Sequence, residues 1–507
     1  MLMSKKALSL FVLLSLATTG VWAADTAADH GDSKLVKFQQ ATIVSTNEAV
    51  ANKLATDTNV PSTVVLSLPR TVELAYDNNH AVKEAKWAYQ KAIHNVSAVA
   101  AAKNPTIGYS YDMSRGSSSG GGAFGGSSSM NSFKNGLQLK VPIYSGGSLE
   151  ANIESARYDR ESANAAVTQA LQEAKLQAAQ DYYTLIMDRN KIDINKQSVT
   201  DYEGHLTNVN QQYAVGIVAK SDVLSTQTNL ANAQTTLVDS QNTANLAEAT
   251  LNNIIGIPVN TTVETEDKEL KYEAYPVTLE EAKAYALLHR AELIESTMAV
   301  KSAEQEVEAA KAGKLPSISA TAGKNWSGTK MTGTENNNWS VGAGLTWSLW
   351  DGGQSNEKVK MAKDALEIAK EKNSAQIDSV MLDVRQAYLK MKSAEQTINS
   401  TKTAVASGME NYRIASLRYR AGVGTNLDVI DAETALVTAR NNYVDALYNY
   451  NMAVAQLEQA MGIPLDIPVG KGASVVNSSN SISTLDNLVA ASTQTAKSAD
   501  TASAKTE

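Results

Sequence analysis

The sequence contains one long unit twice. The stretch from Tyr213 to Leu224, YAVGIVAKSDVL, returns 206 positions later as the stretch from Tyr419 to Ile430, YRAGVGTNLDVI. The same offset relates Gly146-Gly147 to Gly352-Gly353, whereas upstream, as for Pro105 and Pro316, the offset is 211. The difference is absorbed in the Ser/Gly-rich stretch 117–129, which we interpret as a lengthened, exposed loop. A repeat of this length predicts one duplicated architecture rather than several unrelated domains.

Each copy carries the signals of a turn between two helices. A glycine three residues after the tyrosine suits the end of a helix, where the backbone commonly takes a positive φ. An aspartate six residues further on, Asp222 or Asp428, suits the first turn of the next helix, because its charge complements the helix dipole. The predicted hairpin-turn residues are Tyr213, Gly216, Gly422 and Gly424.

Unbroken helical patterns lead into both turns. The stretches 148–212 and 354–418 contain no proline, which predicts helices of about 100 Å. In the second stretch, apolar residues step by three and four, the spacing of a coiled coil. These residues are Ile377, Val380, Val384, Ala387, Met391, Ala394 and Ile398. With a shorter returning helix, the predicted hairpins span 148–254 and 354–461. Helices at about 71–103 and 280–314 are expected to cover the remaining half by stacking end to end.

Strict alternation of apolar and polar residues predicts four strands. They lie at about 105–114, 132–144, 316–326 and 338–350. Each is close to the ~9–11 residues with which a tilted strand crosses a bilayer. The alternative is an antiparallel sheet with one wet face in a soluble domain. Because four strands are too few to close a membrane barrel, a transmembrane sheet would require the chain to oligomerise.

The N-terminus and the composition restrict the compartment and the chemistry. Lys5-Lys6, an apolar run and the small residues around Ala23 predict a secretory signal peptide. No later apolar run is long enough for a membrane-spanning helix. The absence of cysteine excludes disulfides, thiolate metal sites and a lipid anchor on a mature N-terminal cysteine. The net charge of −8, without a basic cluster, argues against nucleic acid as a partner.

The sequence thus predicts a duplicated chain without an enzymatic site. The predicted segments are a signal peptide at 1–23, an N-terminal extension at 24–65, a first repeat at 66–258, an equatorial connector at 259–276, a second repeat at 277–465 and a disordered tail at 466–507. The five histidines are scattered, and no Gly-x-Ser-x-Gly or His-Glu-x-x-His motif occurs. We therefore expect no catalytic residue, no metal site and no cofactor.

These features together resemble the TolC-like outer membrane efflux protein family, from about Leu66 to Leu465. The resemblance rests on motifs that occur twice in the same order: Lys-Asn-Pro-Thr-Ile and Lys-Leu-Pro-Ser-Ile at strand starts, Pro-Ile-Tyr-Ser-Gly-Gly and Ser-Leu-Trp-Asp-Gly-Gly at strand ends, and Asp-Val-Leu and Asp-Val-Ile-Asp-Ala after the turns. It implies a mixed α and transmembrane β fold, in which a trimeric 12-stranded β-barrel, four strands per chain, continues into an antiparallel α-helical coiled-coil tunnel.

The resemblance also implies a location and partners. The protein is expected in the cell outer membrane, spanning into the periplasm, as the exit duct of a tripartite efflux or type I secretion system. Its expected partners are two further copies in a homotrimer, a periplasmic adaptor (membrane fusion) protein, an inner-membrane pump of the RND, ABC or MFS type, and outer membrane lipid. The alternatives are a non-conducting coiled-coil tether in the outer membrane and a soluble periplasmic binding module.

The same resemblance assigns a gate to the two turns. Tyr419 matches the family's gate tyrosine, Asp222 the acidic residue that it contacts, and Asp428 and Asp431 the carboxylates that ring the constriction. Gly424 stands at the position of a gate arginine, so that salt bridge is absent here. In a trimer the Asp428 and Asp431 carboxylates would attract cations and raise one another's pKa. The alternative is that these aspartates only complement helix dipoles and that Tyr419 only packs at a helix end.

Overall fold

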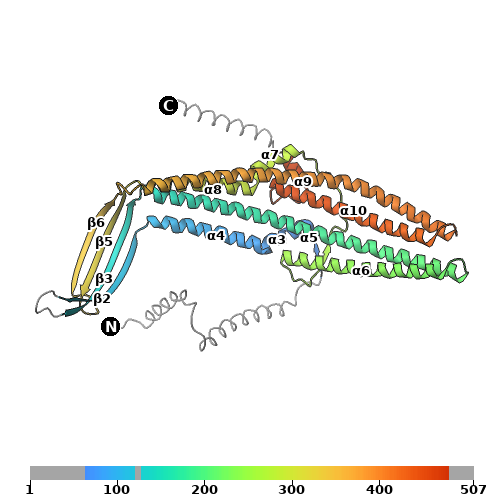
Figure 1. Cartoon of the computed structure of the whole chain (residues 1–507), viewed down its shortest axis with the longest axis horizontal. Coiled ribbons are helices and arrows are strands. Elements are labelled where there is room, and N and C mark those ends of the chain that lie inside the picture. Colours follow the sequence, from blue (N-terminus) through green and yellow to red (C-terminus); the bar gives the residue numbers. More distant parts are fainter. Residues whose placement is uncertain (1–62, 120–126, 479–507) are drawn as a thin grey trace, which may run out of the picture. The chain divides into compact units, whose positions relative to one another are not determined.

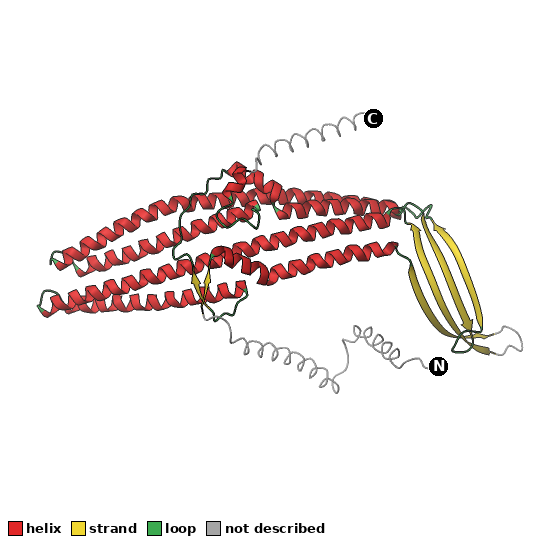
Figure 2. Cartoon of the chain, turned by 180° about the vertical axis from the view of Figure 1, so that it is seen from behind, coloured by secondary structure: helices red, strands yellow, loops and turns green. Residues whose placement is uncertain are grey.

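The computed structural model describes residues 63–119 and 127–478. The signal peptide predicted at 1–23, the extension up to residue 62, the centre of the Ser/Gly-rich loop and the tail from residue 479 lie outside the described residues. Within the described part, two long helical hairpins pack against each other (Figures 1 and 2). Their helices are α5 (Ser148–Ala214) with α6 (Lys220–Ile255), and α9 (Gln354–Arg420) with α10 (Asn426–Met461).

The two hairpins have matching dimensions. Helices α5 and α9 each have 67 residues, and α6 and α10 each have 36. At 1.5 Å per residue the long helices measure about 100 Å. Along α9 the coiled-coil positions Val380, Val384, Met391 and Ile398 are buried. Ile377, the first residue of the coiled-coil seam, is 37% exposed, so among the described residues of this single chain no helix covers the N-terminal end of the seam. Among the described residues, no helix has both the length and the apolar character needed to cross a membrane.

The helices predicted at about 71–103 and 280–314 are each divided in two, which corrects that prediction. The segments are α3 (Leu68–Asn78), α4 (His80–Ala100) with the short 3₁₀ helix η1 (Ala101–Lys103), α7 (Leu279–His289) and α8 (Ala291–Ala312). The breaks fall at Asn79 and Arg290, which take non-helical backbone conformations. The Asn79 side chain caps α4 by accepting from the amide of Ala81 at 2.8 Å. Arg290 instead donates to the carbonyl of Ala460 at 2.8 Å, at the end of α10.

Four strands form one antiparallel sheet in the order β2-β3-β5-β6. Their bounds are β2 Thr106–Ser119, β3 Ser127–Tyr144, β5 Ser317–Gly328 and β6 Asn336–Thr346. The first hairpin is longer than predicted, because the backbone ladder continues into both ends of the Ser/Gly-rich stretch, as far as the pair Ser119 and Ser127. The last strand is shorter than predicted, since the ladder ends at the pair Ser317 and Thr346, next to Pro316, which lacks an N–H. Beyond the strand, the Trp347 indole donates to the carbonyl of Lys314 at 3.0 Å.

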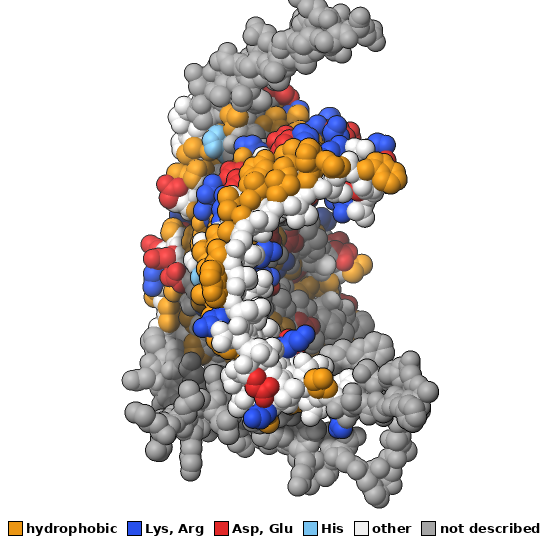
Figure 3. Space-filling view, turned by 90° about the vertical axis from the view of Figure 1, so that its left-hand side faces the viewer, with side chains coloured by type: hydrophobic (Ala, Val, Ile, Leu, Met, Phe, Trp, Pro, Cys, Tyr) orange, Lys and Arg blue, Asp and Glu red, His pale blue; other side chains and the backbone are white. Residues whose placement is uncertain are grey.

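The register gives the sheet one apolar face. Tyr109 pairs with Leu137, Leu139 with Ala322, and Ala322 with Val341, so these side chains lie on the same side. The intervening positions carry Gly, Ser, Thr, Gln and Lys. Figure 3 shows the hydrophobic side chains along the outer side of a curved wall, with small and charged side chains along the inner side. Of the apolar face, Ile107, Met113 and Val341 are exposed in this chain.

The largest apolar core lies halfway along the helices, beneath the segments 256–278 and 462–478, which we call the belt. Its most deeply buried side chains include Tyr182, Leu251 and Leu457. Strand β1 (Thr63–Leu66) pairs in parallel with β4 (Thr262–Thr265), so residues 63–65, assigned to the extension, belong to the folded unit. Residues 466–478, predicted as part of a disordered tail, are likewise folded and contain α11 (Ala473–Ser478), which corrects that part of the prediction. Its buried Ala473 and Val476 explain why it packs.

Hydrogen bonds to buried side chains of α5 and α10 hold the belt segment 462–478 in place. The Glu458 carboxylate, 3% exposed, accepts from the amide of Gly470 at 2.8 Å and from that of Gly472 at 2.6 Å. The ammonium group of Lys175 on α5 donates to the carbonyl of Ile467 at 2.6 Å. Burial raises the pKa of Glu458, while these two amides and Lys175 oppose that effect. The two backbone amides thus offset part of the cost of burying this carboxylate.

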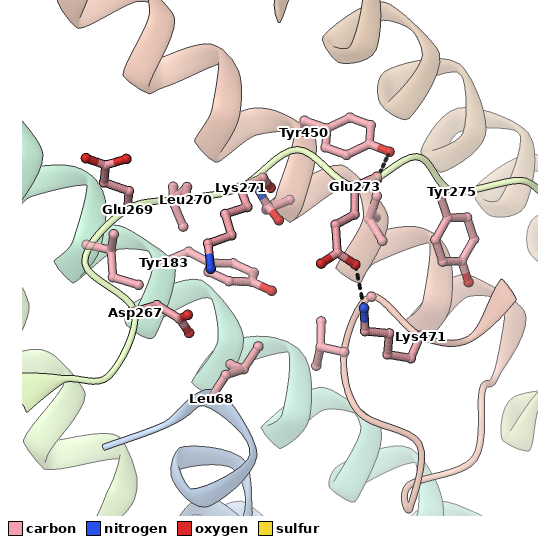
Figure 4. Close-up of a pocket in the computed structure, with 15 residues that line it drawn as sticks. Leu68, Tyr183, Asp267, Glu269, Leu270, Lys271, Glu273, Tyr275, Tyr450 and Lys471 are labelled. Atoms are coloured by element: carbon pink, nitrogen blue, oxygen red, sulfur yellow. Dashed lines mark hydrogen bonds and ion pairs between the residues drawn. The ribbon is translucent and has the colours of Figure 1, made fainter. Parts of the chain in front are cut away.

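A hollow of about 200 Å³, open to solvent, lies where the two segments of the belt meet (Figure 4). An ion pair between Glu273 and Lys471 crosses it. The Tyr450 hydroxyl donates to the carbonyl of Glu273 at 2.7 Å. The belt segments are therefore bound to each other as well as to α10.

Candidate gate at the two helical tips

The first tip joins α5 to α6. Gly216, with φ of 78°, donates its amide to the carbonyl of Tyr213 at 2.9 Å, and the next amide donates to Gln212 at 2.9 Å. These bonds satisfy the last carbonyls of α5. Tyr213 itself is exposed, and the Lys220 ammonium lies 5.6 Å from its ring centroid. Asp222 follows in the first turn of α6 and is half-buried.

The second tip joins α9 to α10 and is more tightly capped. Thr425 and Asp428 form a reciprocal capping box: the Asp428 amide donates to the Thr425 hydroxyl at 3.1 Å, and the Thr425 amide donates to the Asp428 carboxylate at 3.0 Å. Gly422 has φ of 74°, a conformation that favours glycine. At Gly424 a Cβ would lie only 3.0 Å from the amide nitrogen of Tyr419. A larger residue there would have to displace the end of α9.

A small apolar cluster holds the two tips together. It consists of Val209, Val223, Tyr419 and Val429, one residue from each of the four hairpin helices. Tyr419 is 3% exposed, and its ring packs edge to face against that of His205, with 4.9 Å between the two ring centroids. The side-chain amide of Gln212 also donates to the backbone carbonyl of Tyr419 at 3.2 Å.

A buried polar network lies beside this cluster. The His205 ring nitrogen Nε2 is 2.7 Å from the side-chain oxygen of Asn426, which also accepts from the Thr226 hydroxyl at 3.1 Å. The Asn426 amide donates to the carbonyl of Asp222 at 3.3 Å. Burial lowers the pKa of His205, with the Asn426 contact opposing the shift. The network joins α5, α6 and α10, and sequence reasoning missed it because its members are far apart along the chain.

The structure places the gate residues predicted from the sequence in different surroundings. Tyr419 is buried, its hydroxyl has no hydrogen-bond partner among the described residues, and burial and the Asp222 charge raise its pKa. Asp428 and Asp431 are exposed. Hydrogen bonds from Thr425 and the charge of Arg418 lower the pKa of Asp428, the opposite direction to the predicted like-charge effect between chains. Asp428 thus has a structural role in capping α10.

The capping box yields a testable prediction. Thr425→Ala removes the hydroxyl that accepts from the Asp428 amide, and should lower the free energy of unfolding by about 1 kcal/mol. Chemical denaturation of the purified protein measures this change. Ser221→Ala is the matched control, because the first turn of α6 has no side-chain cap. Equal stability of the two variants would contradict the assigned cap.

The tips have no grouping suited to a metal. Within residues 63–119 and 127–478, no three His, Asp or Glu side chains converge in a way that could hold a metal ion. The two tips are joined instead by contacts that can break and re-form, namely an apolar cluster and a network of neutral hydrogen bonds. They also carry exposed carboxylates.

A four-stranded sheet with one apolar face, joined to two long antiparallel helical hairpins, is the fold of a solved outer membrane channel. The chain belongs to the outer membrane efflux protein family, whose model matches residues 71–257 and 284–463. This family membership confirms the resemblance, the outer membrane location and the function as an efflux channel. The family is one of channel proteins rather than enzymes.

Individual relatives agree with this assignment. The outer membrane efflux protein BepC of Brucella suis is 23% identical over 383 residues, covering 73% of this chain and 80% of BepC. The alkaline protease secretion protein AprF of Pseudomonas aeruginosa is 24% identical over 394 residues, covering 73% and 78%. The outer membrane protein TolC of Escherichia coli is 26% identical over 290 residues, covering 54% and 57%.

Solved structures share the fold. The outer-membrane channel OprN superposes with a TM-score of 0.68 at 18% identity, over 78% of this chain and 90% of OprN. The CmeC outer membrane channel of Campylobacter jejuni gives a TM-score of 0.68 at 17% identity, over 91% of this chain and 94% of CmeC.

Proposed function

We propose that the protein is the passive outer membrane exit duct of a tripartite efflux or type I secretion system, gated at its helical tips. The observation that carries this proposal is the one-sided sheet. Its apolar face suits lipid, while the opposite face of Gly, Ser, Thr and Lys suits a water-filled lumen. The relatives named for efflux and for protease secretion support export as the task.

The proposed duct is a homotrimer. Among the described strands, β2 and β6 each have one side without a partner strand. Lipid offers no partner for backbone N–H and C=O groups, so such edges must pair with another chain. Three copies of four strands would close a 12-stranded barrel, with the hairpins of the sequence repeat continuing it as a tunnel. A periplasmic adaptor and an inner-membrane pump of the RND, ABC or MFS type would supply the drive.

In this proposal the gate is the pair of tips. Opening separates the α5–α6 tip from the α9–α10 tip, which breaks the packing of Tyr419 against His205 and moves Asp222 away from it. Asp428 and Asp431, both exposed, would then line the constriction of the trimer. The contacts to be broken are apolar or neutral, which suits a gate that a partner opens mechanically.

Planar-bilayer conductance of the detergent-purified protein, with its oligomeric mass measured in the same preparation, tests the duct. We expect trimers that form discrete, cation-selective channels. Trimers that do not conduct even after disruption of the tips, for example by Tyr419→Ala with Asp222→Asn, would instead identify a membrane-anchored tether. A monomer that is extracted without detergent would contradict both the duct and the tether.

Block by cations tests the carboxylates. The double variant Asp428→Asn with Asp431→Asn should weaken block by a multivalent cation at least tenfold, because six negative charges are removed from the proposed constriction. Asp239→Asn, an exposed acid on α6, is the control and should leave block unchanged. Unaltered block in the double variant, measured in single-channel recordings, would remove these residues from the conduction path.

A further inference from the structure

One acidic side chain lies buried at the contact between the hairpins. Glu433, on α10 two turns from the second tip, is 1% exposed. Neither of its carboxylate oxygens has a partner at full hydrogen-bond geometry among the described residues, and the Ser198 side chain provides only a weak polar contact. An ionised carboxylate in such a site costs several kcal/mol unless it is paired. The position therefore calls for an explanation that packing alone does not provide.

The charged and titratable groups around Glu433 come from three helices. Helix α5 contributes Asp201, held at 3.0 Å by the Gln197 amide, and Tyr202, whose hydroxyl lies 3.4 Å from that of Thr434. Helix α9 contributes Tyr412, whose pKa is raised first by burial and then by the charges of Asp201 and Glu433. Helix α10 itself contributes Arg440, two turns beyond Glu433, and Asp431, two residues nearer the tip. His205 lies one turn further along α5.

These surroundings disfavour a negative charge. Burial, and then the negative charge of Asp201, raise the pKa of Glu433 to about 7, against the opposing effects of Ser198 and Arg440. Burial likewise raises the pKa of Asp201. The pKa of His205 is lowered, so this neighbour does not supply a compensating positive charge near neutral pH. With α5 and α10 packed together, Glu433 is therefore mainly protonated only below about pH 7.

We propose that Glu433 and Asp201 form a pH-sensitive contact between α5 and α10, which we call the joint. Protonated Glu433 keeps the two hairpins packed together near the tips, and ionisation of Glu433 separates them. This inference deepens the proposed gate by naming a regulator of it. The ligand is a proton, and the moving part is the α5–α10 contact. Alkaline conditions would favour the open arrangement.

The direction follows from linkage. When the helices separate, water reaches Glu433 and its pKa returns toward the ordinary value of 4.5. Between that value and about 7 the packed state holds a proton that the separated state has lost, so packing weakens as the pH rises through this window. Above it both states are ionised and the equilibrium no longer changes. Between pH 5 and pH 8 the ratio of separated to packed states should rise on the order of tens-fold.

Spin-label distances test the joint directly. The full chain contains no cysteine, so Thr207→Cys on α5 and Thr438→Cys on α10, both at exposed positions, provide the only labelling sites. Pulsed electron–electron distance measurements on the detergent-purified protein, diluted with unlabelled chains, report the separation within one chain. We expect a longer-distance population that grows between pH 5 and pH 7 and then levels off.

Two variants and one control decide the outcome. Glu433→Gln keeps the shape but cannot ionise, so its distances should not depend on pH. Asp201→Asn removes the adjacent negative charge, so the response should level off at a lower pH. Glu410→Gln, an exposed acid paired with Arg413 on α9, should behave as the unsubstituted protein. Distances that are independent of pH in the unsubstituted protein, or a full response in Glu433→Gln, would overturn the joint. Because the measurement needs no conductance, its failure is distinct from failure of the proposed duct.

Discussion

Glu458→Leu is expected to lower the free energy of unfolding by about 3–5 kcal/mol, the largest effect of any single substitution proposed here. The carboxylate is the acceptor for the half-buried amide of Gly470 and the buried amide of Gly472, and it lies in the electrostatic field of Lys175. Leucine fills a similar volume but leaves both amides unpaired and the lysine less compensated. The belt segment 462–478 should detach and become a site of rapid proteolysis, detected by mass spectrometry of the fragments.

The matched control is Glu273→Leu in the same belt. Glu273 is exposed and pairs with Lys471, a surface ion pair that contributes at most about 1 kcal/mol. Glu458→Gln, which retains one acceptor oxygen, should fall between the two. If the denaturation midpoint falls further in Glu273→Leu than in Glu458→Leu, the exposed ion pair with Lys471 stabilises the belt more than the buried carboxylate does.

Gly462→Ala is expected to cost about 2–4 kcal/mol. The residue ends α10 with φ of 73°, and a Cβ there would lie 2.9 Å from the carbonyl oxygen of His289 and 3.1 Å from the Cα of Arg290. Both neighbours are backbone atoms at the break between α7 and α8, so the clash cannot be relieved by a side-chain rotation. The substitution combines left-handed strain with overpacking.

Gly422→Ala separates these two effects. This glycine follows the end of α9 with a nearly equal φ of 74°, but no atom of the described residues lies within 4 Å of the position that a Cβ would take. It should therefore cost only the conformational term, about 1 kcal/mol. If thermal unfolding in detergent gives the two variants the same loss, the contact between the end of α10 and the α7–α8 break does not stabilise the fold.

The repeated elements were predictable because their signals are local. The positive φ at Gly216 and Gly422 follows from a glycine at the end of a long periodic stretch, and alternation along the strands located the sheet. Two helices predicted as continuous are broken at Asn79 and Arg290, because a side-chain cap and a distant carbonyl outweigh local helix propensity. Strand β6 ends earlier than its alternation predicts, because the neighbouring strand β5 does not extend beyond Ser317 at this end and offers no further backbone partners.

The candidate site was only partly visible in the sequence. Tyr419 and the aspartates stand in recognisable motifs at the tips. His205, Asn426, Glu433 and Asp201 do not, since each is an ordinary polar residue on a helix until the hairpins bring them together. Of the belt, the first segment was predicted as a connector at 259–276, but residues 466–478 were wrongly assigned to a disordered tail. Their packing depends on Glu458 on α10 and Lys175 on α5, two buried side chains that no local pattern connects to this segment.

The unpaired edges of β2 and β6 determine how such a chain can mature. On the proposed trimer, no single copy can complete its insertion into lipid, because each copy brings two open edges and an exposed apolar wall. Insertion and association must therefore occur as one event, whose rate depends steeply on the concentration of chains in the periplasm. The long helices can fold first and bring three copies into register, so that the membrane-embedded part is assembled last and all at once.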